Sequence, residues 1–137
     1  MSKIMRLNSL IKNKSISSCE LTKAYLKEIE KQNSILNAFI SVSPETALNA
    51  ATIVDSKIAA GKPIGLLEGI PIALKDNIST QGLETTCASN MLSGYRPIYD
   101  AFVWQLLSRH NAPLLGKCNM DEFAMGSTCE SSCKGGA

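Results

Sequence analysis

The amino-acid sequence predicts an α/β fold in which helices flank a sheet of short strands. Segments with helical periodicity alternate with short apolar segments that are bounded by Gly, Pro or Asn. Of the 137 residues, 45% are apolar, which is enough to build a core. Only 5% are aromatic, so aliphatic side chains must fill that core. The alternation is typical of a sheet whose strands are joined by helices.

The first predicted helix covers residues 18–34. Ser17 and Glu20 form a capping-box pattern at its start, because a serine is followed three residues later by a glutamate. Apolar residues then recur every four positions and mark one buried face, formed by Leu21, Tyr25 and Ile29. The lysines and glutamates between them are expected on a solvated face.

The next predicted elements are a strand over residues 38–42 and a helix from Pro44 to Ala60. Proline suits the first helical position, and Gly61 is a common helix stop. A second strand is predicted over residues 67–74, although Pro71 favours an edge or an irregular position there.

The remaining segments alternate between loop, helix and strand. Asp76 and Asn77 begin a turn, and residues 80–95 read as a long polar loop with one helical turn. Asp100 is the expected N-cap of a third helix. The buried side of that helix is predicted to carry Val103, Leu106 and Leu107. Pro113 prevents its continuation, and a short strand is predicted over residues 112–116.

Composition excludes several classes of function. The net charge of +2 is too small, and the basic residues too scattered, to indicate nucleic-acid binding. No apolar segment approaches the roughly 20 residues of a membrane span. The five cysteines are odd in number and irregularly spaced, which favours reduced thiols in a cytoplasmic protein.

Lys75 is the main candidate for chemistry, because it closes the apolar, strand-like run Gly-Ile-Pro-Ile-Ala-Leu-Lys-Asp-Asn-Ile. A lysine that faces an apolar interior loses hydration of its ammonium, which favours the neutral amine that a base requires. Asp76 is expected to hold the backbone or a neighbouring residue. The alternative is a surface lysine that starts a turn.

Other candidate sites are weaker. His110, Cys118, Cys129 and Cys133 lack the paired spacings of zinc sites, so no metal is expected. Gly116-Lys117 fails as a phosphate loop, since the earlier glycine and the following Ser/Thr are missing. Cys87 has no identifiable catalytic partner. The segment from Gly126 to Ser132 reads either as a plain polar loop or as a pocket wall with exposed backbone N–H groups.

Three segments together resemble the amidase signature family: Gly69–Ile78, Thr85–Ser89 and Gly116–Gly126. The run Met-Asp-Glu-Phe-Ala-Met-Gly, residues 120–126, is most similar to the A subunits of bacterial-type glutamyl-tRNA(Gln) amidotransferases within that family. The resemblance extends from about Leu7 to Ser132. It implies the N-terminal part of the amidase signature fold, with a mixed sheet flanked by helices.

The resemblance implies a Ser–cis-Ser–Lys mechanism, in which glutamine is hydrolysed to supply ammonia for Gln-tRNA(Gln) formation. Lys75 matches the catalytic lysine, and Met125, Gly126 and Ser127 match a segment that lines the substrate pocket. Lys117 and Asp121 are expected to be structural. The implied partners are the amidotransferase subunits B and C and, through them, Glu-tRNA(Gln). ATP and Mg²⁺ are expected in a partner subunit of this carbon–nitrogen ligase complex, and no cofactor in this chain.

The family's Gly-Gly-Ser-Ser-Gly-Gly run, which carries the cis-serine, does not occur in the sequence. Residues 1–137 are therefore expected to be a truncated, incomplete amidase domain that is inactive alone. Two alternatives stay open. The chain is a non-catalytic remnant or partner-binding module, or it is part of an amidase for another small amide.

Overall fold

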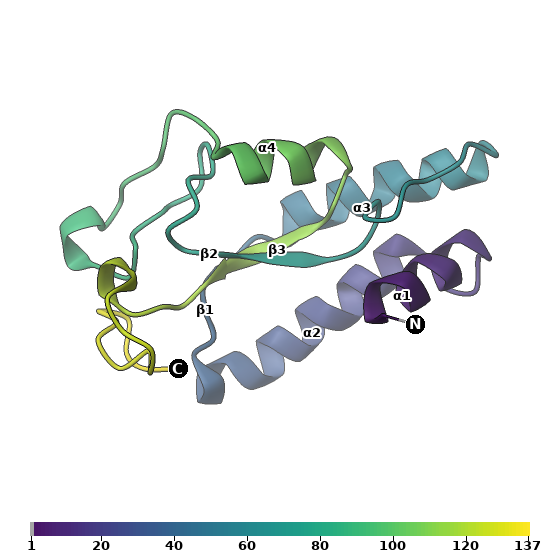
Figure 1. Cartoon of the computed structure of the whole chain (residues 1–137). Helices are drawn as coiled ribbons and strands as arrows, with labels where there is room; N and C mark the ends of the chain where they lie inside the picture. The colour runs from purple at the N-terminus through teal and green to yellow at the C-terminus, as the bar shows by residue number, and fades with distance from the viewer. Residues whose placement is uncertain (1) are drawn as a thin grey trace. The chain divides into compact units, whose positions relative to one another are not determined.

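The computed structural model describes residues 2–137. Its helices and strands follow the order α1 (Lys3–Lys12), α2 (Ser18–Leu36), β1 (Phe39–Val42), α3 (Pro44–Ala59), β2 (Ile72–Lys75), α4 (Phe102–Arg109) and β3 (Leu114–Cys118) (Figure 1). Two single-turn 3-10 helices, η1 (Asn90–Leu92) and η2 (Glu122–Ala124), lie within loops. The alternation of helices and short strands confirms the predicted α/β class. None of the helices formed by residues 2–137 has the length and apolar character that a membrane span requires.

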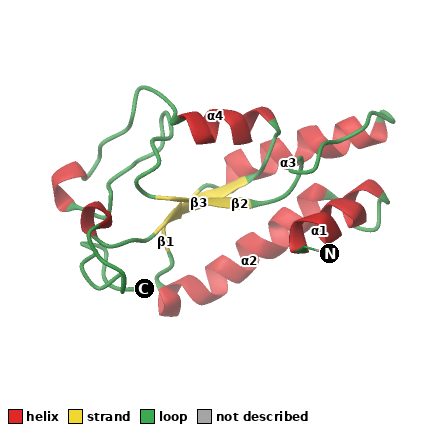
Figure 2. Cartoon of the chain, in the orientation of Figure 1, coloured by secondary structure: helices red, strands yellow, loops and turns green. Residues whose placement is uncertain are grey.

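The three strands form one mixed sheet in the order β1-β3-β2 (Figure 2). β1 is antiparallel to β3. β2 runs parallel to β3, because the N–H of Ile72 donates to the carbonyl of Pro113 and that of Asp76 to the carbonyl of Cys118. Gly116 allows β1 to approach β3 closely, since a Cβ there would lie 2.9 Å from Cα of Val42. The mixed sheet with its helices is the arrangement that the resemblance implied.

The chain forms two compact units. The first comprises residues 2–28, 43–72 and 106–115, and the second comprises residues 29–42, 73–105 and 116–137. All candidate site residues named above except His110 belong to the second unit. The two units are therefore described separately.

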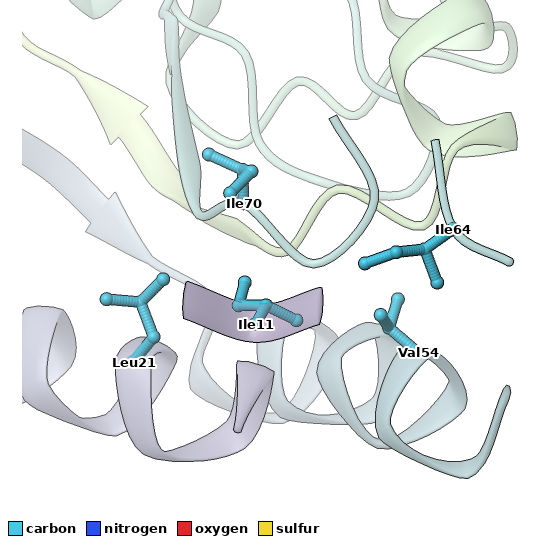
Figure 3. Close-up of a cluster of buried hydrophobic side chains, with 5 residues drawn as sticks. All are labelled: Ile11, Leu21, Val54, Ile64 and Ile70. Atoms are coloured by element: carbon cyan, nitrogen blue, oxygen red, sulfur yellow. The ribbon is translucent and has the colours of Figure 1, made fainter. Parts of the chain in front are cut away.

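The core of the first unit is a cluster of aliphatic side chains (Figure 3). These residues come from α1, α2, α3 and the loop before β2, and they are Ile11, Leu21, Val54, Ile64 and Ile70. Tyr25 and Ile58 pack against them from the edge. Leu21 and Tyr25 thus lie on the buried face of α2 that the four-residue repeat predicted.

The helix ends in the first unit follow their sequence signals. Ser17 and Glu20 form both bonds of the capping box, at 2.8 and 3.0 Å. Asp55 adds a second carboxylate at this end of α2, because it accepts the N–H groups of Ser18 and Cys19 at 2.7 and 3.0 Å. Gly61, with φ +70°, follows the end of α3 as predicted.

The strand predicted over residues 67–74 exists but has other bounds, because only Ile72–Lys75 forms a strand. The N–H of Ile70 bonds back to the carbonyl of Leu67, so residues 67–70 make a turn. Gly69 adopts φ +76°, and a Cβ there would lie 2.9 Å from Oγ of Ser18. The turn brings Gly69 close to α2, where a side chain would not fit.

The predicted buried side of the third helix, α4, is wrong. Val103 and Leu106 are 47% and 42% exposed, whereas Trp104 is 8% exposed. The apolar side of the helix, formed by Phe102, Val103, Trp104, Leu106 and Leu107, is broader than the face that is buried, so periodicity did not single out Trp104. The prediction of Asp100 as the N-cap is also wrong, because α4 begins at Phe102 and the Asp100 carboxylate instead accepts the N–H of Gln81 at 2.6 Å. Helix α1, which the sequence analysis did not predict, begins at Lys3 and is capped by Ser2, whose hydroxyl accepts the N–H of Met5.

Thr22 offers a test of packing in the first unit. It is fully buried, and its hydroxyl has no hydrogen-bond partner among the described residues. Thr22→Val is expected to raise the free energy of unfolding by about 1 kcal/mol, because an unsatisfied buried hydroxyl is removed. Urea denaturation checks this, with Thr52→Val on the exposed side of α3 as the control. A lower stability of Thr22→Val would contradict the assignment.

Candidate functional site

Lys75 is the last residue of β2, and its side chain is exposed. Successive strand residues point to opposite faces. Leu74, which is 4% exposed, takes the buried face, so Lys75 points the other way. The expectation that Lys75 faces an apolar interior is therefore wrong for this chain.

Lys75 instead lines a hollow of about 300 Å³ in the second unit. This volume lies at the lower end of the range for small-molecule sites. The rest of the lining comes from the loop that follows β3 and consists of Asn119, Met120, Asp121, Ala124, Gly126, Ser127, Thr128 and Cys129. The polar residues around the hollow carry one exposed ammonium, a carboxylate, an amide, two hydroxyls and a thiol.

Asp76 lies on the buried face beside Lys75 and is 1% exposed. Its Oδ2 accepts the backbone N–H and the hydroxyl of Thr86, at 2.8 and 2.6 Å. Its backbone carbonyl accepts the N–H of Cys87. Asp76 thus holds both the backbone and a neighbouring loop, as its position in the sequence predicted.

Lys117, on β3, is completely buried. Its Nζ donates to the carbonyl of Ile78 at 2.8 Å and to Oγ1 of Thr85 at 2.9 Å, and lies 3.5 Å from Oδ1 of Asp76. Burial lowers the pKa of the Lys117 ammonium, and the Asp76 carboxylate opposes that shift. The lysine that the structure desolvates is therefore Lys117 and not Lys75.

Asp121 organises the loop on the other side of the hollow. Its carboxylate accepts the N–H of Cys129 at 2.9 Å, the N–H of Ser131 at 3.2 Å and the hydroxyl of Ser131 at 2.9 Å. The backbone bond from Cys129, followed by that from Ser131, holds the pKa of the Asp121 carboxyl below its usual value. The N–H groups of Cys129 and Ser131 are thus bound by Asp121, which favours the plain polar loop over a pocket wall with exposed N–H groups.

Gly126 packs directly on the Asp121 carboxylate. A Cβ at Gly126 would lie 2.6 and 2.7 Å from the two carboxylate oxygens. Gly126→Ala is therefore expected to lower the free energy of unfolding by about 1–3 kcal/mol, as overpacked sites do. Urea denaturation checks this. Gly136→Ala is the matched control, because a Cβ there would approach the Cys129 carbonyl only to 3.4 Å. Equal stability of the two variants would contradict the close packing.

The structure brings together three of the four residues that the resemblance assigned to a site. Lys75, Gly126 and Ser127 line the same hollow. Met125 is not among its described lining residues and is 76% exposed. Asp76, Lys117 and Asp121 support the site, and the sequence reading had assigned Lys117 and Asp121 only a structural role. All three residues lie within segments that resemble the family, and that position was the only sign of their role in the sequence.

The thiols and the histidine form no second site among residues 2–137. No cluster of three or more His, Cys, Asp or Glu side chains there could hold a metal ion. All five cysteines are free. Burial raises the pKa of the Cys87 thiol, and the Asp76 carboxylate adds to the shift. A raised pKa disfavours the thiolate that a cysteine nucleophile needs.

Comparisons with known proteins identify the family and the fold. The family model described as Amidase matches residues 20–137. The A subunit of glutamyl-tRNA(Gln) amidotransferase from Dehalococcoides mccartyi (strain CBDB1) is 50% identical over 129 residues, 94% of this chain and 26% of the relative. The corresponding subunit from Gloeobacter violaceus is 44% identical over 135 residues, 98% of this chain and 28% of the relative.

A solved structure shows the same fold. The native peptide amidase from Stenotrophomonas maltophilia superposes with a TM-score of 0.87 at 33% identity, over 98% of this chain and 29% of the amidase. The chain thus spans little more than a quarter of the length of the proteins that it matches. Because the family model covers most of the chain and the structural likeness nearly all of it, the chain belongs to the amidase signature family.

Proposed function

We propose that this chain supplies the lysine-bearing part of an amidase active site, with Lys75 as the proton-accepting residue. The observation that carries the proposal is that Lys75, Gly126 and Ser127 line one hollow. These positions match the catalytic lysine and the substrate segment in the resemblance. Lys75 is exposed in this chain. We therefore infer that other residues must cover it before it acts as a base.

The proposed substrate is the side-chain amide of glutamine. Relatives named as A subunits of glutamyl-tRNA(Gln) amidotransferase, at 44% and 50% identity, support this choice. In such a complex, ammonia released here would be used with ATP and Mg²⁺ in a partner subunit. Subunits B and C would be the protein partners, and Glu-tRNA(Gln) the acceptor.

The proposed reaction is acyl transfer. A serine hydroxyl attacks the amide carbon, its proton passes through a second serine to Nζ of Lys75, and ammonia leaves as the acyl-enzyme forms. Water then hydrolyses the ester and gives glutamate. Both serines would come from the part of the family's chain that these residues do not span. Lys75 would accept the proton and return it, while the loop around Gly126 and Ser127 would contact the substrate.

Ammonia release from glutamine tests the proposal. The chain alone is expected to release none, because the family's Gly-Gly-Ser-Ser-Gly-Gly run does not occur in residues 1–137. A chimera in which residues 1–137 replace the matching segment of the Dehalococcoides mccartyi relative is expected to release ammonia. Release of ammonia by the chain alone would contradict the proposal that both serines come from another part of the family's chain. An inactive but folded chimera would favour a non-catalytic module, and a preference for aliphatic or aryl amides would favour another amidase.

A further inference from the structure

We propose that Lys117 is a positioning residue for Lys75, acting through the buried turn that follows β2. The inference rests on the proposed function only for the role of Lys75. Its own evidence is the set of contacts around the Lys117 ammonium. The sequence analysis expected Lys117 to be structural but did not connect it with Lys75.

The burial of Lys117 is unusual for a lysine. Lysines normally extend the ammonium into water while the aliphatic stem packs on the protein. Here the whole side chain is buried, and Nζ is surrounded by oxygen atoms of Ile78, Thr85 and Asp76. The thiols of Cys87 and Cys118 are the other titratable groups that act on it. The ammonium donates two hydrogen bonds, to Ile78 and Thr85, and its contact with Oδ1 of Asp76 is an ion pair at 3.5 Å, because that oxygen accepts no hydrogen bond from the described residues.

These contacts join three segments that are far apart in the sequence. Lys117 lies on β3, Ile78 and Asp76 lie in the turn after β2, and Thr85 lies in the polar loop. Asp76 closes the network, because its second carboxylate oxygen accepts both donors of Thr86. The ammonium and the carboxylate therefore hold the turn from opposite ends.

The turn after β2 also determines where Lys75 points. The N–H of Asp76 donates to the carbonyl of Cys118, and the N–H of Ile78 donates to the carbonyl of Lys75. With Asp76 fixed on the buried face, the alternation of strand side chains directs Lys75 to the face of the hollow. Release of Asp76 or Ile78 would free the backbone that directly follows Lys75.

Stability alone is a weak reason for this pair. Buried ion pairs are often no more stabilising than apolar residues of similar volume, because removing two charges from water is costly. Their best-attested use is to specify one arrangement among several. Because Asp76 is adjacent to Lys75, the Asp76–Lys117 pair can fix the arrangement of the chain at the proposed base.

The experiment measures the acetylation rate of each lysine in the 137-residue chain, with N-hydroxysuccinimidyl acetate as the probe and peptide mass spectrometry as the readout. Lys117→Met is expected to change the rate at Lys75 several-fold. Thr85→Val, which removes one acceptor and keeps the charge pair, is expected to give a smaller change in the same direction. Thr22→Val is the matched control, because its hydroxyl makes no contact with this network. Rates at the exposed Lys23 and Lys27 should stay constant in all three variants.

Circular dichroism confirms that each variant is folded at the assay temperature. A residue that only stabilises the fold would lower the melting temperature and leave the rate at Lys75 unchanged in the folded chain. An unchanged Lys75 rate in folded Lys117→Met overturns the proposal. If Lys117→Met does not fold, an unchanged rate in Thr85→Val overturns it instead. The assay needs no amidase activity, so its outcome is independent of whether the chimera hydrolyses glutamine.

Discussion

Lys75→Met in the chimera is expected to lower kcat for glutamine hydrolysis by about 10²–10⁴-fold, the usual contribution of a positioned acid–base group. Methionine keeps the unbranched stem of lysine and removes the amine that would accept the serine proton. The change is expected in kcat more than in KM, because the proton is transferred in the transition state. Ammonia release at several glutamine concentrations separates the two constants.

Lys75→Arg sharpens this test. Arginine keeps the positive charge, but its guanidinium does not lose a proton in proteins. It is therefore expected to be as inactive as Lys75→Met. Lys23→Met, on the exposed face of α2, is the control and should leave activity unchanged. Near-normal activity in Lys75→Arg would show that charge alone matters, and near-normal activity in Lys75→Met would remove Lys75 from the reaction.

Asp76→Ala is expected to lower the free energy of unfolding of the chain by about 3–5 kcal/mol, because it leaves the buried Lys117 ammonium without its counter-charge. The variant also removes the acceptor of the two bonds from Thr86. Urea denaturation followed by circular dichroism measures the change. The cost is large compared with the total stability of a typical domain, so partial unfolding in water is an equally clear result.

The double variant Asp76→Ala/Lys117→Met separates charge from packing. If the uncompensated ammonium is the main cost, the double variant is expected to be more stable than Asp76→Ala alone. Asp100→Ala is the matched control, because its carboxylate accepts one N–H group, from Gln81, in a half-exposed position. A loss of about 1 kcal/mol is expected there. Similar losses for Asp76→Ala and Asp100→Ala would contradict the buried pair.

Motif matches located part of the site without any structure. Lys75, Gly126 and Ser127 were found because short strings of the sequence resemble the family, and the structure places all three around one hollow. Asp76 was assigned a backbone-holding role from its alternation with Lys75, and its bonds to Thr86 fit that role. Lys117 and Asp121 were expected to be structural, and their hydrogen bonds to Thr85 and Ser131 fit that role. The ion pair of Lys117 with Asp76 was not predicted, because the two residues are 41 positions apart in the chain.

The sequence by itself determined the features that depend on neighbouring residues. The capping box at Ser17 and the proline at the start of α3 give local bonds and local dihedral angles, so they could be read directly from the chain. The stop after α3 at Gly61 is equally local. Family membership also followed from short strings.

Only the tertiary structure decided which polar side chains are buried. Lys75 and Lys117 both end or interrupt apolar, strand-like segments, and nothing in their immediate neighbours separates them. Lys117 is buried because Asp76 and Thr85, 41 and 32 residues away, supply the oxygens that compensate its desolvation. The same holds for α4, whose buried face is marked by Trp104 and not by the predicted Val103. Burial depends on partners that are distant in the chain, and a local pattern carries no information about them.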